Sequence, residues 1–229
     1  MEKKNLPIHI AIIPDGNRRW ARKRSLPTLE GHRRGFDRAY ELVKKARDMG
    51  IKIVTLWAFS TENWKRTTEE VGYLMHLYEL MIGKHVKDAQ ENNTRLIHIG
   101  RKDRIPSKLL KKIMEAEKIT ENNKKYFLCI GIDYGGEDEI LRAVGKMVKL
   151  SNVVDHDSLF SCLDTATLPQ QYVDLMIRTS GELRMSGFLP LQSTYAEFAF
   201  SEKMFPDFTP EDFEKSIADY ILRKRRFGK

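Results

Sequence analysis

The stretch "IHIAIIPDGNRRWARK", residues 8–23, decides how the fold is built. It opens with an apolar run that stops at Pro14, and a run of this length bounded by proline is typical of a buried strand. Asp15, Gly16 and two arginines follow directly after the proline. A buried strand that ends in this way places a carboxylate and two cations at the edge of a sheet.

Strand-like and helix-like segments alternate along the whole chain. Further buried strands are expected at 51–59, 94–100, 126–132, 173–179 and 195–200, and helices at 31–50, 67–93, 106–121, 137–149 and 210–226. This alternation predicts an α/β fold, a central and mostly parallel six-stranded sheet flanked by helices on both faces. Because no linker, repeat or low-complexity segment interrupts the pattern, we expect a single domain over residues 1–229.

The bulk composition narrows the classes of function. Hydrophobic residues make up 41% of the 229 residues, but no apolar stretch reaches the ~20 residues that span a bilayer. The N-terminus lacks a signal-peptide pattern, and Cys129 and Cys162 lack zinc or redox spacing, so we expect a cytoplasmic protein. The formal net charge of +8 fits three kinds of partner, a nucleic acid, an anionic membrane surface or a polyanionic small substrate.

Unusual polar loops follow four of the expected strands. They read "PDGNRRW" (14–20), "STENWKR" (60–66), "DYGG" (133–136) and "TSGELRMSG" (179–187). Ligands of open α/β sheets bind beyond the carboxyl ends of the strands. We therefore expect all four loops to open on one edge of the sheet and to form the site there.

The first loop combines anion-binding residues with a carboxylate. Gly16 lets the backbone approach a ligand closely, and Arg18 and Arg19 are suited to phosphate oxygens. Asp15 would repel an anion unless it holds Mg²⁺, which bridges carboxylate and diphosphate oxygens. The alternative is that Asp15 and Asn17 only form the turn after the proline.

A second basic cluster lies on the loop after the fifth strand. Arg178, Arg184 and Ser186 are spaced over a loop that also contains two glycines. Two arginine clusters at strand ends favour two phosphorylated ligands, or one long one. The alternative is a loop held by salt bridges, with Glu182 as the obvious partner. Neither cluster matches the P-loop or the dinucleotide-binding pattern.

The loop "STENW" (60–64) contains polar residues that could relay a proton. Next to them stands an aromatic residue that could contact an apolar substrate. The loop's alternative role is helix entry, because such polar residues are good caps. The helix expected at 67–93 carries an apolar stripe of Met, Leu and Tyr residues. The stripe is either core or the wall of an apolar tunnel, and periodicity does not separate the two.

Taken together, these segments resemble the cis-prenyltransferase family, which includes undecaprenyl diphosphate synthase and dehydrodolichyl diphosphate synthase. The segments "HIAIIPDGNRRWARK", "GHRRG", "LWAFSTENWKR", "DYGG", "DLMIRTSGELRMSGFLP", "QSTYAEFAF" and "FPDF" occur in the family's order and span residues 8–208. The resemblance implies a sheet with flanking helices, a hydrophobic tunnel and a homodimer formed through the C-terminal half. It implies a transferase of isoprenoid biosynthesis that condenses isopentenyl diphosphate with an allylic diphosphate primer, using Mg²⁺, to give a Z-polyprenyl diphosphate.

The resemblance also assigns roles to residues. Asp15 would bind Mg²⁺ and assist departure of the allylic diphosphate, and Asn63 stands where the family places its proton acceptor. The expected substrate-binding residues are Gly16, Asn17, Arg18, Arg19, Trp20 and His32 around the allylic diphosphate, Ser60, Thr61, Glu62, Trp64 and Arg66 between the substrates, and Arg178, Arg184, Met185 and Ser186 at the isopentenyl diphosphate. Glu197 would be a second Mg²⁺ contact from the partner subunit, and Arg226 and Gly228 would reach across the dimer.

Some positions bear on substrate preference and product length. Departures from the common bacterial pattern are Arg18, Thr28, Glu137 and Leu191. They leave the core motifs intact, so the reaction is expected and the primer, product length and product fate stay open. Ala58 is small enough to let a chain pass, whereas Tyr126 or Phe127 would shorten the product if either points into the tunnel.

Two other functions compete with this one. A non-catalytic partner subunit of a heteromeric prenyltransferase usually lacks the catalytic aspartate, whereas Asp15 is present here. A basic nucleic-acid-binding protein would explain the charge but not Asp15 among the arginines, and no such motif is found. The C-terminal "RKRR" (223–226) could contact anionic lipid transiently.

Overall fold

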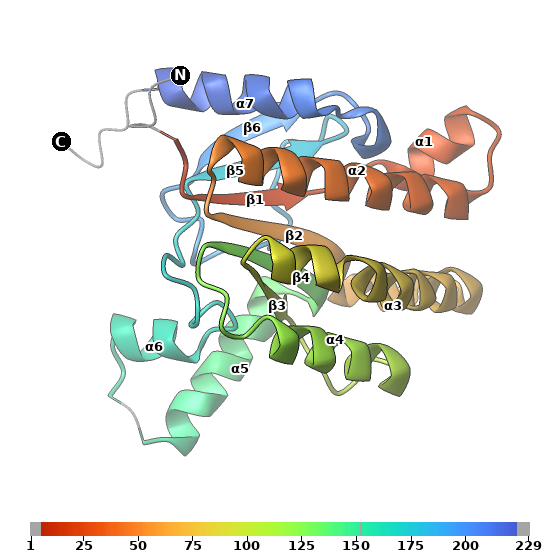
Figure 1. Cartoon of the computed structure of the whole chain (residues 1–229). Helices are drawn as coiled ribbons and strands as arrows, with labels where there is room; N and C mark the ends of the chain where they lie inside the picture. The colour runs from red at the N-terminus through yellow and green to blue at the C-terminus, as the bar shows by residue number, and fades with distance from the viewer. Residues whose placement is uncertain (1–5, 152, 224–229) are drawn as a thin grey trace.

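The computed structural model describes residues 6–151 and 153–223 and has a six-stranded sheet at its centre (Figure 1). The strands are β1 (His9–Ile13), β2 (Ile53–Ser60), β3 (Thr94–Ile99), β4 (Tyr126–Tyr134), β5 (Leu175–Thr179) and β6 (Glu197–Ser201). Their order is β3-β4-β2-β1-β5-β6, and each neighbouring pair is parallel. The expected α/β fold is confirmed.

The helices lie in the connections from β1 to β5 and after β6. They are α1 (Asn17–Lys23), α2 (Thr28–Met49), α3 (Thr68–Glu91), α4 (Ser107–Ile119), α5 (Gly136–Lys149), α6 (His156–Cys162) and α7 (Pro210–Leu222), with short 3-10 helices η2 (Thr61–Lys65) and η3 (Phe205–Asp207). The sequence did not predict α1 and α6, because seven residues are too few to show helical periodicity. The last expected helix ends at Leu222, and the end of its expected range lies outside the described residues.

One face of the sheet is covered by the long helices. Leu42 of α2 and Phe213 of α7 pack on Ile10 and Ile12 of β1 in a fully buried cluster. Farther along the same face, α3 and α4 pack against Ile132 of β4. Alternate residues of a strand point to opposite faces, and Ile10 and Ile12 of β1 and Leu128, Ile130 and Ile132 of β4 face these helices.

The opposite face is covered mainly by the long connection between β5 and β6. Phe188 and Leu189 of this connection pack on Ala11, Ile13 and Met176 of the sheet. Helices α5 and α6 pack on each other and extend away from the rest of the fold (Figure 1). Among the helices of the described segments, none has the length and apolar character needed to cross a membrane.

Strand register brings the polar loops together. Ile13 of β1 pairs with Arg178 of β5, and Ser60 of β2 pairs with Tyr134 of β4. All four loops therefore leave the same carboxyl edge of the sheet, as expected. The loops after β1 and β5 come from adjacent strands, which sets the two arginine clusters side by side.

Candidate active site

Asp15 occupies the centre of this edge. Its Oδ2 accepts a hydrogen bond from Nη2 of Arg178 at 2.9 Å, and its Oδ1 lies 3.3 Å from Nη2 of Arg19. Thr179 fixes the backbone, because the Asp15 N–H donates to the Thr179 hydroxyl at 3.0 Å and that hydroxyl donates to the Asp15 carbonyl at 2.8 Å. The Asp15 side chain is 30% exposed, so the carboxylate is held firmly and still open to a ligand.

The turn after Asp15 depends on two close approaches. Gly16 has a φ of +97°, and a Cβ there would lie 2.6 Å from Oγ of Ser180. Asn17 begins α1, and its Oδ1 would lie 2.5 Å from a Cβ placed at Gly35 of α2. Only glycine at both positions lets α1 start directly beside α2. The Ser180 hydroxyl and Asn17 Oδ1 are buried without a hydrogen-bond partner among the described residues.

Glu182 connects the two arginine clusters. Its Oε1 lies 3.1 Å from Nη1 of Arg19, and its Oε2 lies 2.6 Å from Nη1 of Arg184. The alternative in which Glu182 holds the loop by salt bridges is thus confirmed for these contacts. Both arginines remain substantially exposed, so their guanidinium groups can still meet a ligand.

Arg178 organises the second loop from a buried position. Its Nη1 donates to the Arg184 carbonyl at 2.6 Å and to the Ser186 hydroxyl at 2.8 Å, while Nη2 holds Asp15. Met185, between them, packs partly buried against the core under Phe188. The guanidinium of Arg178 therefore joins the loop after β5 to the loop after β1.

Glu70 lies near the start of the helix expected at 67–93, and the sequence did not single it out as a site residue. Its Oε1 accepts from Nη1 of Arg66 at 3.1 Å, lies 3.1 Å from Nε2 of His32 and lies 3.6 Å from Nε of Arg18. Its side chain is only 9% exposed. Burial lowers the pKa of His32 below its ordinary value, and the hydrogen bond to Glu70 opposes this. Three groups from three segments converge on one carboxylate, a pattern that no local motif encodes.

The loop after β2 is built around a helix cap. The Ser60 N–H donates to Oδ1 of Asn63 at 3.1 Å, and the Ser60 side chain accepts from the backbone of Asn63 in return. The helix-entry alternative is therefore confirmed for these two residues. Next to them, the Thr61 hydroxyl donates to Glu62 at 2.8 Å.

Two tryptophans expected near substrate have protein partners. Nε1 of Trp64 donates to Asp133 at 2.8 Å, and its ring packs edge-on against Phe59. Nε1 of Trp20 donates to Asp207 of η3 at 2.7 Å. Both rings are thus fixed beside the site by specific hydrogen bonds.

Within one chain, Glu197 lies away from the edge of the sheet that carries Asp15. It is the first residue of β6, pairs with Leu175, and its Oε2 accepts from Nη1 of Arg223 at 2.9 Å. This end of the strand is opposite to the edge that carries Asp15. Among the described residues, no group of three or more His, Cys, Asp or Glu side chains is placed to hold a metal. Arg226 and Gly228 lie outside those residues.

An apolar cavity of about 160 Å³ opens beside the start of α1. It lies between α2, α3 and the sheet, and Asn17 and His32 line one end of it. Ala58 is part of its wall, as expected. Phe127 is not, since it packs on the opposite face of the sheet, so the condition under which it would shorten the product is not met. The Tyr126 ring instead lies near the ammonium groups of neighbouring lysines.

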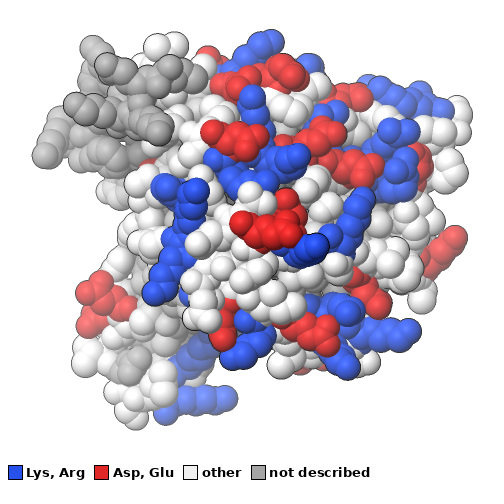
Figure 2. Space-filling model, viewed as in Figure 1, with Lys and Arg blue, Asp and Glu red and all other residues white. Residues whose placement is uncertain are grey.

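Charge is mixed on the face of the molecule drawn in Figure 2. Figure 2 shows Lys and Arg side chains interspersed with Asp and Glu side chains on one face of the molecule. Such interspersed cations suit small local anion sites better than one extended polyanion.

Comparison with known proteins extends over nearly the whole chain. Residues 13–228 match the family model described as "Putative undecaprenyl diphosphate synthase". An isoprenyl transferase from Aquifex pyrophilus is 45% identical over 225 residues, covering 98% of this chain and 96% of the relative. The crystal structure of lavandulyl diphosphate synthase from Lavandula x intermedia in complex with dimethylallyl diphosphate superposes with a TM-score of 0.94 at 33% identity, covering 99% of this chain and 100% of that chain. A probable undecaprenyl diphosphate synthase from Campylobacter jejuni gives a TM-score of 0.83 at 32% identity, covering 98% and 100%.

Proposed function

The chain belongs to the undecaprenyl diphosphate synthase family of prenyltransferases, and from this premise we propose that it condenses isopentenyl diphosphate with an allylic diphosphate to give a Z-polyprenyl diphosphate, using Mg²⁺. One observation carries the proposal. Asp15 is held between Arg19 and Arg178 at an edge where an apolar cavity also opens. Cations and a carboxylate suit a metal-bound diphosphate, and the cavity suits its hydrocarbon chain.

The donor set fits Mg²⁺. Mg²⁺ is commonly bound by one or two carboxylates, with waters and substrate phosphates completing the shell. Asp15 is a carboxylate of this kind, partly exposed among arginines that would hold the phosphates. When bound, Mg²⁺ supplies a Lewis acid that offsets negative charge on the departing diphosphate.

The two diphosphates would occupy the two loops. The turn from Gly16 to Arg19 would hold the allylic diphosphate, and Arg184 and Ser186 would hold isopentenyl diphosphate. As the allylic bond breaks, negative charge grows on the leaving group, and cations placed there beforehand stabilise the transition state. Arg178 would keep both loops in register, because it contacts Asp15, Ser186 and the backbone of Arg184.

A proton must leave the new chain after the carbon–carbon bond forms. The Asn63 amide is a weak base, and its oxygen already accepts from the Ser60 N–H. We therefore assign Asn63 a positioning role. The proton would pass to the departing diphosphate or to a relay through Ser60 and His32. Burial lowers the pKa of His32, so its ring is neutral near pH 7 and has a nitrogen that can accept a proton.

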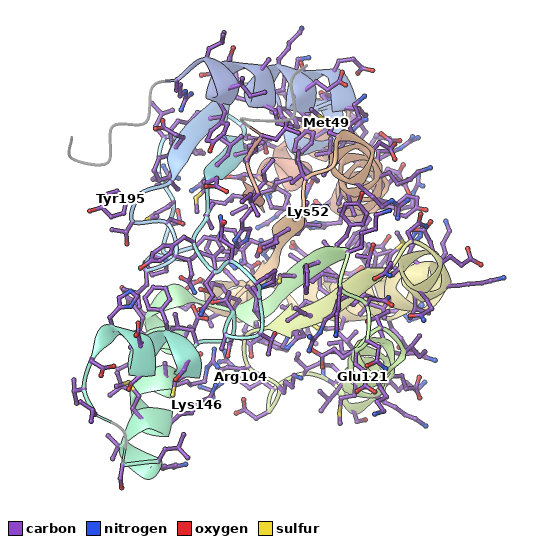
Figure 3. All side chains as sticks on the ribbon, turned by 60° about the vertical axis from the view of Figure 1, so that its left-hand side comes forward. Met49, Lys52, Arg104, Glu121, Lys146 and Tyr195 are labelled. Carbon is purple, nitrogen blue, oxygen red and sulfur yellow. The ribbon has the colours of Figure 1, made fainter. Side chains whose placement is uncertain are left out.

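The proposed assembly is a homodimer of one catalytic domain per chain, in the cytoplasm and in transient contact with membrane. Leu141 and Val148 on the outer face of α5 are 73% and 74% exposed, which favours a covered surface there. In the dimer, Glu197 would add a Mg²⁺ contact to the partner's site. Tyr195, in the loop just before β6, projects away from the body of the chain (Figure 3).

A labelled-substrate assay tests the proposal. Radiolabelled isopentenyl diphosphate is incubated with Mg²⁺ and a panel of allylic primers, and the products are separated by length. Asp15→Ala should lower kcat by about 10²- to 10³-fold, the range seen when one preorganised charge-stabilising group is lost. Asp37→Ala removes an exposed carboxylate of α2 and serves as the control.

Other outcomes separate the alternatives. Incorporation that appears only when a second chain is added would favour the partner-subunit function. A lavandulyl diphosphate product would indicate the activity that the name of the Lavandula x intermedia relative states. No product under any of these conditions would rule out the proposed reaction.

A further inference from the structure

The apolar cavity ends in polar groups. At the end away from Asp15 it is lined by Arg47 and Asp88, with His85 and Thr94 beside them. Nη1 of Arg47 donates to Oδ2 of Asp88 at 3.1 Å, which joins α2 to α3 across this end. We call these four residues the polar floor. The walls above it are mainly aliphatic and aromatic.

The polar floor lies far from the diphosphate end. His32 and Arg47 both line the cavity from α2, and a helix rises 1.5 Å per residue, so they mark points about 22 Å apart. On the sheet side, Ala58 and Ile132 line the cavity near the carboxyl edge, and Thr94 lines it at the first residue of β3. A hydrocarbon that grows from the diphosphate end therefore meets apolar walls first and the ion pair last.

Two groups of the polar floor lack protein partners. Nε2 of His85 and Oγ1 of Thr94 are buried without a hydrogen bond among the described residues. The His85 ring stacks on Tyr40 at 3.9 Å, which holds it across the gap between α2 and α3. Polar atoms of this kind are satisfied by water, and covering them with hydrocarbon costs free energy. The ion pair carries the same cost, because its charges lose water when apolar atoms displace it.

The two bulky residues at the start of β4, Tyr126 and Phe127, do not close this end of the cavity. Nζ of Lys52 lies 5.2 Å from the ring centre of Tyr126. Tyr126 is not among the residues that line the cavity. Phe127 faces the other side of the sheet. Leu96 of β3 and Leu128 of β4 line the cavity near this end, and Thr94 lies two residues beyond Leu96 along its strand. The described wall thus passes from these leucines to the polar floor.

We propose that the polar floor, with the Arg47–Asp88 ion pair at its centre, limits the length of the prenyl product. The inference rests on the proposed elongation reaction. Each added unit gains apolar burial while it contacts the aliphatic walls. The next unit would have to strip water from the ion pair, so elongation stops there because of desolvation and not because space runs out.

Replacing the ion pair by apolar residues of similar volume tests this. Arg47→Met combined with Asp88→Leu removes both charges and leaves no unpaired one, a change that is often neutral or stabilising. The product ladder should shift upward by at least one isoprene unit, while the rate of the first condensation stays the same. Thr94→Val, which replaces a hydroxyl by a methyl group, should shift the ladder in the same direction and covers the case that the double variant does not fold.

The matched control is Arg33→Met combined with Asp37→Leu. It removes an ion pair of α2 whose two residues are exposed and do not line the cavity. Its ladder should equal that of the wild type. If the Arg47–Asp88 and Thr94 variants also leave the ladder of an active enzyme unchanged, or if only Tyr126→Ala lengthens it, the inference is overturned and the proposed function stands.

A binding series makes the test independent of turnover. Thermal stability is measured with prenyl diphosphates of increasing length, without isopentenyl diphosphate. Stabilisation of the wild type should stop rising at the length that reaches the polar floor, and the double variant should continue to gain. Equal plateaus in both proteins would contradict the inference even if no elongation is found.

Discussion

Arg178 donates from Nη2 to Oδ2 of Asp15 over 2.9 Å, although 163 residues separate the two in the chain. The parallel pairing of β1 with β5 makes this contact possible, because it aligns Ile13 with Arg178. A charged hydrogen bond of this kind is short and strong. It holds the carboxylate in place while one of its faces stays open to a ligand.

Arg178→Lys should separate charge from geometry. Lysine keeps the positive charge but loses the planar fork that reaches Asp15, Ser186 and the Arg184 carbonyl together. We expect a rise in the KM for isopentenyl diphosphate and a fall in kcat, measured by steady-state kinetics. Arg33→Lys on the exposed face of α2 is the control. Kinetic constants equal to the wild type's would show that the fork is dispensable.

Glu70→Gln should destabilise the site from within. The change removes the negative charge that faces Arg18, His32 and Arg66, and it leaves two arginines beside a neutral amide. Loss of a hydrogen bond to a charged group typically costs about 1.5–3 kcal/mol of unfolding free energy. Urea denaturation measures this, and Glu69→Gln, one residue earlier and exposed, should cost much less. A similar small loss in both variants would contradict the role given to Glu70.

The same Glu70→Gln variant should change the pKa of His32. Glu70 raises this pKa through its hydrogen bond, against the larger lowering by burial. Without the carboxylate, the pKa of His32 should fall further. NMR titration of the ring resonances follows it directly, and a rise on substitution would show that another group dominates.

Acid should destabilise the fold through His9. Its side chain is fully buried, and burial lowers the pKa of His9 from 6.5 to about 4. Between these two values the unfolded chain binds the proton and the folded chain does not, so stability falls as pH decreases from 6.5 towards 4. The full difference corresponds to about 3 kcal/mol.

Denaturation at a series of pH values checks this prediction. A His9→Asn variant should lose part of the pH dependence between pH 6.5 and 4, while His156→Asn, at an exposed position, should keep it. Burial also lowers the pKa values of His32, His85 and His98, so some acid sensitivity should persist in the His9 variant. Equal slopes for both variants would assign the effect to other groups.

Two glycine substitutions should act in opposite directions. A Cβ at Gly35 would lie 2.5 Å from Oδ1 of Asn17, so Gly35→Ala should push α1 from α2 and lower both stability and activity. Gly72 in α3 has nothing within 4 Å of the same position, so Gly72→Ala should raise the unfolding free energy by about 0.5–1 kcal/mol. Thermal melts and the elongation assay measure both, and a neutral Gly35→Ala would show that the contact relaxes easily.

The sequence was most informative where neighbouring residues carry the signal. The alternation of strands and helices predicted the parallel sheet, and parallel strands place their carboxyl ends at one edge. Asp15, the adjacent arginines and the loop after β5 could therefore be assigned to one site without coordinates. Helices α1 and α6 were missed, because each is seven residues long and therefore spans fewer than two helical turns.

The sequence by itself thus determined the fold class, the edge that carries the site and the residues that follow each strand there, because these depend on patterns within a few residues of one another. Only the tertiary structure decided which groups meet across elements. Glu70 gathers Arg18, His32 and Arg66, Arg47 pairs with Asp88, and Phe127 faces away from the cavity. Each of these depends on how whole helices and strands are rotated and set against one another by packing of the common core, which no local pattern records.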